Sequence, residues 1–326
     1  MTKMTRRILG LAAASVLATG AALPVFAEQT HDRIHFLIPG GAGGGWDGAA
    51  RGVGEALTAA GIVGNATFEN MSGGGGGLAF TYLMDNAQSN YGTLMVQSTP
   101  LIIRGLTGEI SQTFRDAEPI AGVLGDFGAL VVPVDSPIQD FQDFLAAYQA
   151  DPDAVATGGG SVPGGMDHLV ASLVLEAAGV NAEDVQYIPY DAGGTAMAGL
   201  LSGEVQALST GFSEAVEMAE AGEVRILGVT ARERLAEFPD VPTFAEQGAD
   251  MEFVNWRGFF AAPGLPEDQA AAYVDALRAM METPEWEAVR ARNGWTNIWY
   301  SGDDFSRFLE AQENEMREMM TDLGFL

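Results

Sequence analysis

The side chains that most often carry catalysis are scarce in this sequence of 326 residues. Cysteine is absent, which excludes thiol nucleophiles, thiolate metal sites and disulfides. Lys3 is the only lysine, and because it lies in a predicted leader, the mature chain has no lysine for a pyridoxal Schiff base or a Walker-A motif. Ser161 follows Gly159, but Pro163 breaks the Gly-x-Ser-x-Gly pattern of a serine nucleophile. No motif for nucleophilic catalysis is left.

The three histidines are the other residues that could take part in chemistry. His31, His35 and His168 do not have the spacing of metal ligands. His168 falls just inside a predicted helix that points at a cleft. Its sequence position fits contact with a ligand and ordinary packing equally well. We therefore expect that the chain is not an enzyme and that it binds neither a cofactor nor a metal.

The most informative pattern is a set of four glycine-rich segments, each of which follows a predicted strand. They cover residues 39–47, 72–77, 157–165 and 190–195. In open α/β sheets, ligands bind beyond the carboxyl ends of the strands, where helix N-termini point. Glycine allows bare N–H groups to approach an anion, and the helix dipole adds partial positive charge. Four such loops indicate two jaws around one small anion, although tight turns between strand and helix remain the alternative for any single loop.

The residues expected at this anion site come from these loops and from two further strand ends. Ser98 and Thr99 would add hydroxyl donors, with helix capping as the alternative. Asp47 is more simply explained by capping its helix or by pairing with Arg51, four residues on. The full set of expected ligand-binding residues is Gly43, Gly44, Gly45, Trp46, Asp47, Ser98, Thr99, Ser161, Gly164, Gly165, His168, Tyr190, Asp191, Gly194, Thr195 and Arg257.

Arg257 is included because a polycarboxylate needs a counter-charge. Without its leader, the chain has 13 arginines against 44 acidic residues, a net charge of −31. This charge makes nucleic acid and anionic membrane surfaces poor partners. Arg257 precedes an apolar run at a predicted crossing between lobes, and its planar guanidinium suits a carboxylate. A structural ion pair is the alternative.

A dinucleotide site is the competing interpretation of the first loop. Gly43-x-Gly45-x-x-Gly48 fits the fingerprint, and Glu69 ends a strand about 20 residues later. Against it, Trp46 would crowd the pyrophosphate, and an exported protein meets little free dinucleotide. The pattern is weak in a chain with 42 glycines.

The first 27 residues have the three parts of a secretory signal peptide. A basic start is followed by an apolar run from Ile8 to Ala22 and by small residues that end at Ala27. The apolar run is short for a membrane span, which is the alternative. We expect a periplasmic protein without a lipid anchor, since no cysteine is present to carry one.

Short apolar strands alternate with amphipathic helices in the remainder, which predicts an α/β fold with largely parallel sheets. Apolar stretches at 120–133 and 253–261 are predicted to cross between lobes, and two long helices, 266–282 and 303–323, close the chain. The order predicts a two-lobed fold: residues 28–125 plus 251–326 form the first lobe, and residues 126–250 form the second. A ligand cleft lies between them.

Six segments, in order along nearly the whole mature chain, resemble the extracytoplasmic solute-binding proteins of tripartite tricarboxylate transporters, the TctC or Bug type. Within that family, Gly43-Gly44-Gly45-Trp46-Asp47 and Asn255-Trp256-Arg257-Gly258 look like the tricarboxylate branch. The segments that carry the resemblance are residues 34–51, 69–76, 190–196, 203–207, 241–248 and 259–264.

The resemblance implies a Venus-flytrap fold, a citrate-like di- or tricarboxylate in the cleft, and delivery of that acid to the membrane subunits of the transporter. We expect a monomer. A sensor that binds the same acid and signals to a membrane kinase is not separable from a transport receptor by sequence. The strongly acidic surface departs from a typical member of the family, which leaves its surface partners open.

Overall fold

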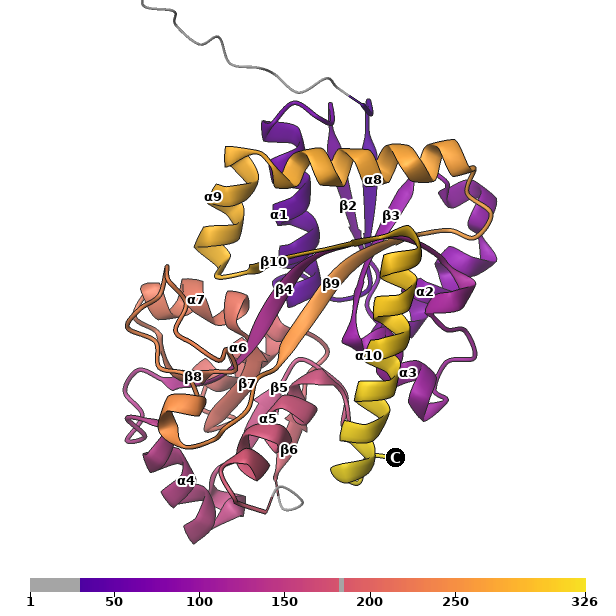
Figure 1. Cartoon of the computed structure of the whole chain (residues 1–326). Coiled ribbons are helices and arrows are strands. Elements are labelled where there is room, and N and C mark those ends of the chain that lie inside the picture. Colours follow the sequence, from indigo (N-terminus) through magenta and orange to yellow (C-terminus); the bar gives the residue numbers. More distant parts are fainter. Residues whose placement is uncertain (1–29, 182–184) are drawn as a thin grey trace, which may run out of the picture.

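Two α/β lobes are joined by two neighbouring strands in Figure 1, and one of the two pairs with strands of both lobes. The computed structural model describes residues 30–181 and 185–326, so the predicted leader at residues 1–27 lies outside the described residues. The joining strands are β4 (Glu118–Pro133) and β9 (Val254–Ala261). In the part of the chain that the structure describes, no helix has both the length and the apolar character needed to cross a membrane.

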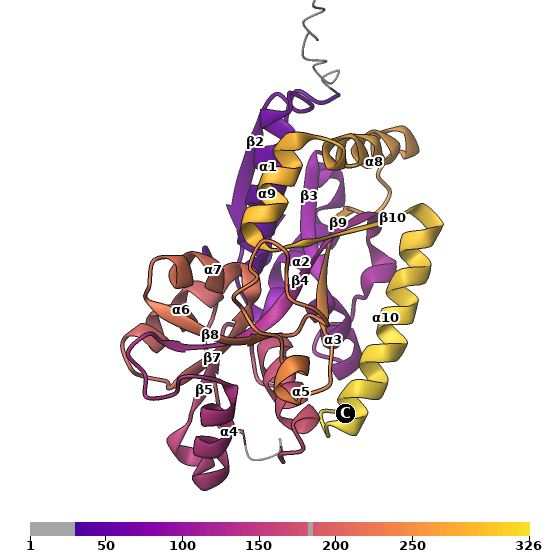
Figure 2. The same cartoon turned by 60° about the vertical axis from the view of Figure 1, so that its left-hand side comes forward.

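Lobe 1 is built on a sheet in the order β2-β1-β3-β9-β4, and β10 also pairs with the first half of β4. Its helices cover both faces of this sheet in Figures 1 and 2. Its further strands are β1 (Ile34–Ile38), β2 (Ala66–Asn70), β3 (Thr93–Ser98) and β10 (Thr296–Ser301). Its helices are α1 (Gly45–Ala59), α2 (Gly77–Asp85), α3 (Thr99–Thr107), α8 (Glu267–Met281), α9 (Pro284–Asn293) and α10 (Gly302–Asp322).

Lobe 2 continues from the second half of β4, which pairs with β7 and β8, and then extends through β5 to β6. Its strands are β5 (Thr157–Gly159), β6 (Tyr187–Pro189), β7 (Ala207–Gly211) and β8 (Val224–Val229). Its helices are α4 (Phe141–Ala150), α5 (Met166–Ala177), α6 (Gly193–Leu201) and α7 (Phe212–Glu220).

The expectation of largely parallel sheets is correct only for the outer strands. Parallel pairing joins β1 to β2 and β3, and joins β5 to β6 and β7. Every antiparallel pairing involves β4 or β9. The reason is topological, because the two crossing strands run against the strands beside them and a pattern of local propensity carries no information on strand direction.

Three elements were absent from the sequence prediction. The helix α3 begins directly at the end of β3, and α9 and β10 stand between the two helices that were predicted to close the chain. The helix α9 is strongly polar, and only two of its side chains, those of Trp286 and Val289, are buried. Short or polar elements of this kind have little hydrophobic periodicity, so their formation depends on the surfaces against which they pack.

Alternation along β9 separates its two faces. Trp256 packs edge-on against Phe305 of α10 with ring centroids 6.1 Å apart, whereas Phe259 on the other face packs against Phe36 of β1 at 5.7 Å. Because side chains alternate with a period of two, Asn255 and Arg257 share the face of Phe259. They lie nearer the boundary between the lobes, so this face places two polar side chains at the cleft.

The C-terminal end of the chain forms a further contact between the lobes. The helix α10 packs beside α3 of lobe 1, and its C-terminal end comes near α5 of lobe 2 in both views (Figures 1 and 2). The ring of Phe325 meets that of His168 edge-on, with centroids 5.0 Å apart. The two lobes are therefore linked by β4, by β9 and by this packed tail.

Candidate functional site

All four glycine-rich loops line one cavity between the lobes, with a volume of about 140 Å³. A cavity of about 150 Å³ accommodates a molecule such as benzene. The space therefore suits a small organic molecule and is far too small for a dinucleotide. The lining residues are Pro39, Gly40, Gly41, Gly44, Gly45, Trp46, Ser72, Gly73, Gly74, Gly75, Gly76, Pro100, Arg104, Gly160, Ser161, Val162, Asp167, Tyr190, Asp191, Ala192, Gly193, Glu214, Asn255 and Arg257.

The loops of the two lobes touch each other directly at this cavity. A Cβ placed on Gly41 of lobe 1 would lie 2.8 Å from the Cβ of Ala192 in lobe 2. A Cβ on Gly194 would lie 2.9 Å from the carbonyl oxygen of Ala42. Such short distances are not compatible with a side chain, so glycine is required where the backbones meet. The structure is that of a closed form.

Two helices, one from each lobe, begin at the cavity wall. The helix α1 begins at Gly45, and its N-cap residue, Gly44, has no side chain to cap the first turn. The helix α6 begins at Gly193. Helix N-termini have free N–H groups and a partial positive charge, which favour an anion. The arrangement can hold a carboxylate between the two lobes through backbone donors.

Arg257 reaches the cavity from β9 and is only 5% exposed. Its Nη1 donates to Oγ of Ser98 at 3.0 Å, and its Nη2 lies 3.5 Å from Oδ2 of Asp126. Its Nε has no hydrogen-bond partner among the described residues. The predicted cation is therefore at the cavity, but its positive charge is already partly balanced by the buried carboxylate of Asp126.

Three acidic side chains surround Arg257 on the side of lobe 2. Asp126 is buried and accepts hydrogen bonds from Oγ and N of Ser213 at 2.7 and 3.3 Å. Burial raises the pKa of Asp126, against the opposing effects of Arg257 and Ser213. Burial also raises the pKa of Asp167 to about 6. For Glu214, burial and the charge of Asp167 raise the pKa to about 8. The cavity thus contains more acidic side chains than we expect for a site that binds a negatively charged ligand.

Arg104 is a second cation at the cavity, which the sequence analysis did not single out. It lies in α3, is 2% exposed and pairs with Glu109. A Cβ on Gly75 would lie 2.7 Å from Nε of Arg104, so the 72–76 loop packs closely on the guanidinium. Arg104 was not identified from the sequence because the helix α3, which places it at the cavity, was not predicted.

Ser98 lies behind the lining and links two of its members. Its Oγ accepts from Nε1 of Trp46 at 2.9 Å and from Nη1 of Arg257 at 3.0 Å. Ser98 is the N-cap of α3 but its side chain makes no capping bond, so the capping alternative does not apply to it. The Oγ1 of Thr99 is buried without a partner in the described residues. Ser98 therefore positions Trp46 and Arg257 and does not itself line the cavity.

Asp47 forms a local network at the start of α1 and does not line the cavity. Its side chain accepts from N of Gly43 at 3.1 Å, from Nε of Arg51 at 2.8 Å and from Nδ2 of Asn70 at 3.0 Å. This is the arrangement that the four-residue spacing of Asp47 and Arg51 indicates. Asp47 thereby holds the glycine loop, and the tip of β2, in place.

His168 and Thr195 are also engaged elsewhere. The Nδ1 of His168 accepts from N of Gly164 at 3.0 Å, and its ring stacks on Tyr187 with centroids 4.5 Å apart. Oγ1 of Thr195 donates to the carbonyl of Ala192 at 2.8 Å, which folds it back on its own turn. Both residues support the loops of lobe 2 by packing and hydrogen bonding.

Seven of the expected residues line the cavity, and nine do not. Those at the cavity are Gly44, Gly45, Trp46, Ser161, Tyr190, Asp191 and Arg257. Those outside its lining are Gly43, Asp47, Ser98, Thr99, Gly164, Gly165, His168, Gly194 and Thr195.

Five polar lining residues were not in the expected set: Ser72, which lies in the second glycine-rich loop, and Arg104, Asp167, Glu214 and Asn255. Asn255 and Asp167 had a usable signal, since one lies two residues before Arg257 on a strand and the other follows the third glycine loop. Glu214 had none, because acidic residues near helix starts are common in so acidic a chain. No group of three or more acidic or histidine side chains suited to a metal ion is found in residues 30–181 and 185–326.

Comparison with known proteins gives matches over most of the chain. The model of the tripartite tricarboxylate transporter family receptor matches residues 49–325. A protein of Cupriavidus necator, described as a UPF0065 protein in the gbd 5′ region, is 27% identical over 322 residues, which cover 97% of this chain and 95% of the relative.

Two solved structures from Rhodopseudomonas palustris share the fold. The adipate-bound protein has a TM-score of 0.79 at 21% identity, and 90% of this chain and 97% of the other are covered. The malate-bound protein MatC has a TM-score of 0.74 at 20% identity, with 91% and 99% covered. The predicted two-lobed binding-protein fold is confirmed. The chain belongs to the tripartite tricarboxylate transporter receptor family, whose members are solute-binding receptors and not enzymes.

Proposed function

We propose that the mature protein is a periplasmic receptor that binds a small di- or tricarboxylate in the cavity between its lobes. The observation that carries this proposal is the meeting of the helix N-termini of α1 and α6 with Arg257 and Arg104 at one cavity between the lobes. Backbone donors and guanidinium groups are the usual partners of carboxylates. Malate and adipate in similar structures support the same ligand class.

We further propose that the receptor is exported by the leader at residues 1–27 and delivers the acid to the membrane subunits of a tripartite tricarboxylate transporter. The first lobe would comprise residues 28–125 plus 251–326, and the second would comprise residues 126–250. These exact boundaries stay predictions. Ligand contacts that exist only when both lobes touch the acid would favour the closed form. The dinucleotide alternative is disfavoured by the size of the cavity.

A thermal-shift screen of the mature protein tests the ligand class. Citrate, malate and adipate are expected to raise the melting temperature, whereas sugars and nicotinamide dinucleotides leave it unchanged. A ligand at a hundred times its dissociation constant stabilises the native state by about 2.7 kcal/mol. A screen in which only a dinucleotide raises the melting temperature would reject the proposal. Delivery is tested separately, by uptake of the labelled acid into cells with and without the receptor.

A further inference from the structure

The positive charges at the cavity are already balanced by carboxylates of the protein. Arg104 pairs with Glu109, and Arg257 faces the buried Asp126. Asp167 and Glu214 line the same cavity, and in the described part of the chain Arg257 is the cation that acts on both of them. If every acid were ionised, a dianionic ligand would enter a site with surplus negative charge, and like charges at close range repel strongly in a desolvated cavity.

Glu214 is the acid in direct contact with the anion-binding backbone of both lobes. It lies in the first turn of α7, and its Oε2 accepts from N of Gly211 at 3.1 Å. Its Oε1 is so close to Gly193 that a Cβ there would lie 1.8 Å away. A Cβ on Gly45 would lie 3.2 Å from Oε2. The carboxyl group thus stands between the first residues of α1 and α6, where a ligand carboxylate would also bind.

A second, independent feature indicates that the same cavity is shaped for a ligand. Asn255 lines it from β9 and is only 8% exposed, and its Oδ1 has no hydrogen-bond partner in the described part of the chain. A buried amide oxygen without a partner is costly, and a ligand group or ordered water is the usual explanation. Nε of Arg257 is likewise a buried polar atom without a hydrogen-bond partner in the described residues.

We propose that Glu214 binds the ligand in its protonated form, as a neutral hydrogen-bond donor to a ligand carboxylate, so that the receptor takes up one proton with each carboxylate dianion it binds at alkaline pH. This inference rests on the proposed function and specifies the charge state that the site accepts. A cationic group on the ligand is disfavoured at this position because two helix N-termini and Arg257 surround it.

The groups that face Glu214 favour the proton. Burial is the largest cause that raises the pKa of Glu214, and the negative charges of Asp167 at the start of α5 and, to a smaller extent, of Asp126 in β4 also raise it. The positive charge of Arg257 in β9 and the hydrogen bond from the N–H of Gly211 lower it. Together they raise the pKa to about 8. The helices α1 and α6 present only backbone at this point. A bound carboxylate is a further negative charge, so it would raise the pKa again.

The test is the pH dependence of binding, measured by titration calorimetry with malate, adipate and citrate on the mature protein. Between pH 7 and 9 the dissociation constant of the wild type is expected to rise about tenfold, because a group with a pKa near 8 loses its proton in this interval. Calorimetry in two buffers of different ionisation enthalpy should show close to one proton taken up per ligand at pH 9. Glu214→Gln keeps a neutral donor, so it should bind within a few-fold of wild type at pH 7 and lose the pH dependence.

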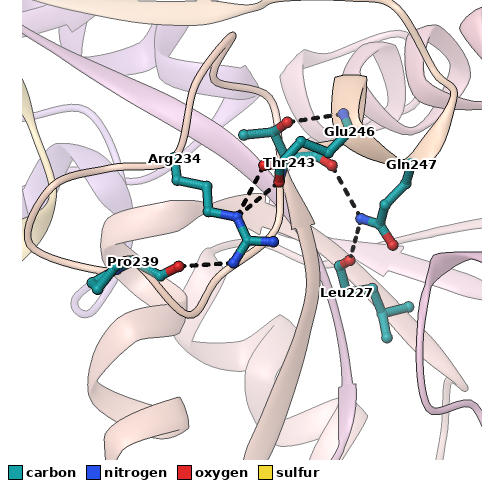
Figure 3. A network of polar contacts seen from close by, with 6 residues as sticks. All are labelled: Leu227, Arg234, Pro239, Thr243, Glu246 and Gln247. Carbon is teal, nitrogen blue, oxygen red and sulfur yellow. Dashed lines mark hydrogen bonds and ion pairs between the residues drawn. The ribbon is translucent and has the colours of Figure 1, made fainter.

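Glu246→Gln is the matched control. Glu246 also accepts a hydrogen bond from a backbone N–H three residues earlier, that of Thr243 at 3.1 Å, but it pairs with Arg234 on the surface of lobe 2 and does not line the cavity (Figure 3). This variant should keep the pH dependence of the wild type, since it removes a carboxylate without changing the site.

Two results would overturn the inference while the proposed function stands: binding that does not change between pH 7 and 9, or a pH dependence that persists in Glu214→Gln. Proton release instead of uptake would also overturn it, because release would mean that Glu214 does not gain a proton when the carboxylate binds. Absence of binding by any carboxylate, even at pH 6, would reject the proposed function itself together with this inference.

Discussion

At the scale of single residues, Arg257 has a structural role as well as a place at the cavity. It is the cation that faces Asp126, and both side chains are almost completely buried. Arg257→Ala should therefore weaken binding of the best carboxylate about ten- to a hundredfold, the effect of a lost charge-assisted hydrogen bond. It should also destabilise the fold by about 3–5 kcal/mol, because Asp126 is left buried without a counter-charge. Calorimetry and urea unfolding measure the two effects separately.

The double variant Arg257→Ala with Asp126→Asn separates these two roles. Neutralising the orphaned carboxylate should restore much of the stability but none of the affinity. If affinity returned together with stability, Arg257 would act only as a structural partner of Asp126. The buried Asp126 is the reason to expect a loss of stability as well as a loss of affinity.

At the scale of elements, the glycine loops set how closely the lobes can approach. Gly41→Ala introduces a Cβ 2.8 Å from the Cβ of Ala192 in the closed form, but it does not affect an open form. Overpacking of this kind costs about 1–3 kcal/mol, so ligand affinity should fall about tenfold or more while stability without ligand is unchanged. Gly48→Ala in α1 is the control, since nothing lies within 4 Å of its added Cβ. Equal affinities of the two variants in calorimetry would contradict a role of the 40–45 loop in closure.

At the scale of the whole molecule, the buried acids predict that the unliganded protein loses stability as pH rises. Native Asp167 and Glu214 hold their protons up to pKa values of about 6 and 8, above their usual 3.8 and 4.5. The native state then binds more protons than the unfolded state between about pH 4.5 and 8, so the free energy of unfolding falls with pH in this window. Melting temperatures at constant ionic strength should decrease from pH 6.5 to pH 8, above the range in which His31 and His168, whose pKa values burial lowers, oppose this trend.

Glu214→Gln should flatten the upper half of this profile, because an amide has no proton to lose. The surface acids with lowered pKa values, such as Glu55 and Glu287, act only below about pH 4.5 and do not affect this window. A melting temperature that increases steadily from pH 6.5 to pH 8 would show that the cavity acids are ionised in the native state.

The sequence alone was sufficient for the features that depend on local pattern. The alternation of apolar strands with helices predicted the two-lobed α/β fold. The sequence also predicts a strand at 66–70 and a helix at 46–60, and β2 and α1 agree with these ranges within a residue. The four glycine loops were identified because a loop between strand and helix needs no distant partner to be recognised. Parallel outer strands then bring their carboxyl ends to one edge, which is why the common cavity was predictable.

Only the tertiary structure decided which charges meet at that cavity. Asp126, Asp167, Glu214 and Arg257 lie on four different elements, and their proximity results from strand order and from the contact of the two lobes. The antiparallel direction of β4 and β9 was likewise not readable from local propensity. Burial is a property of the assembled fold, and it changes a carboxylate that looks like one of many surface acids into a group that keeps its proton near neutral pH.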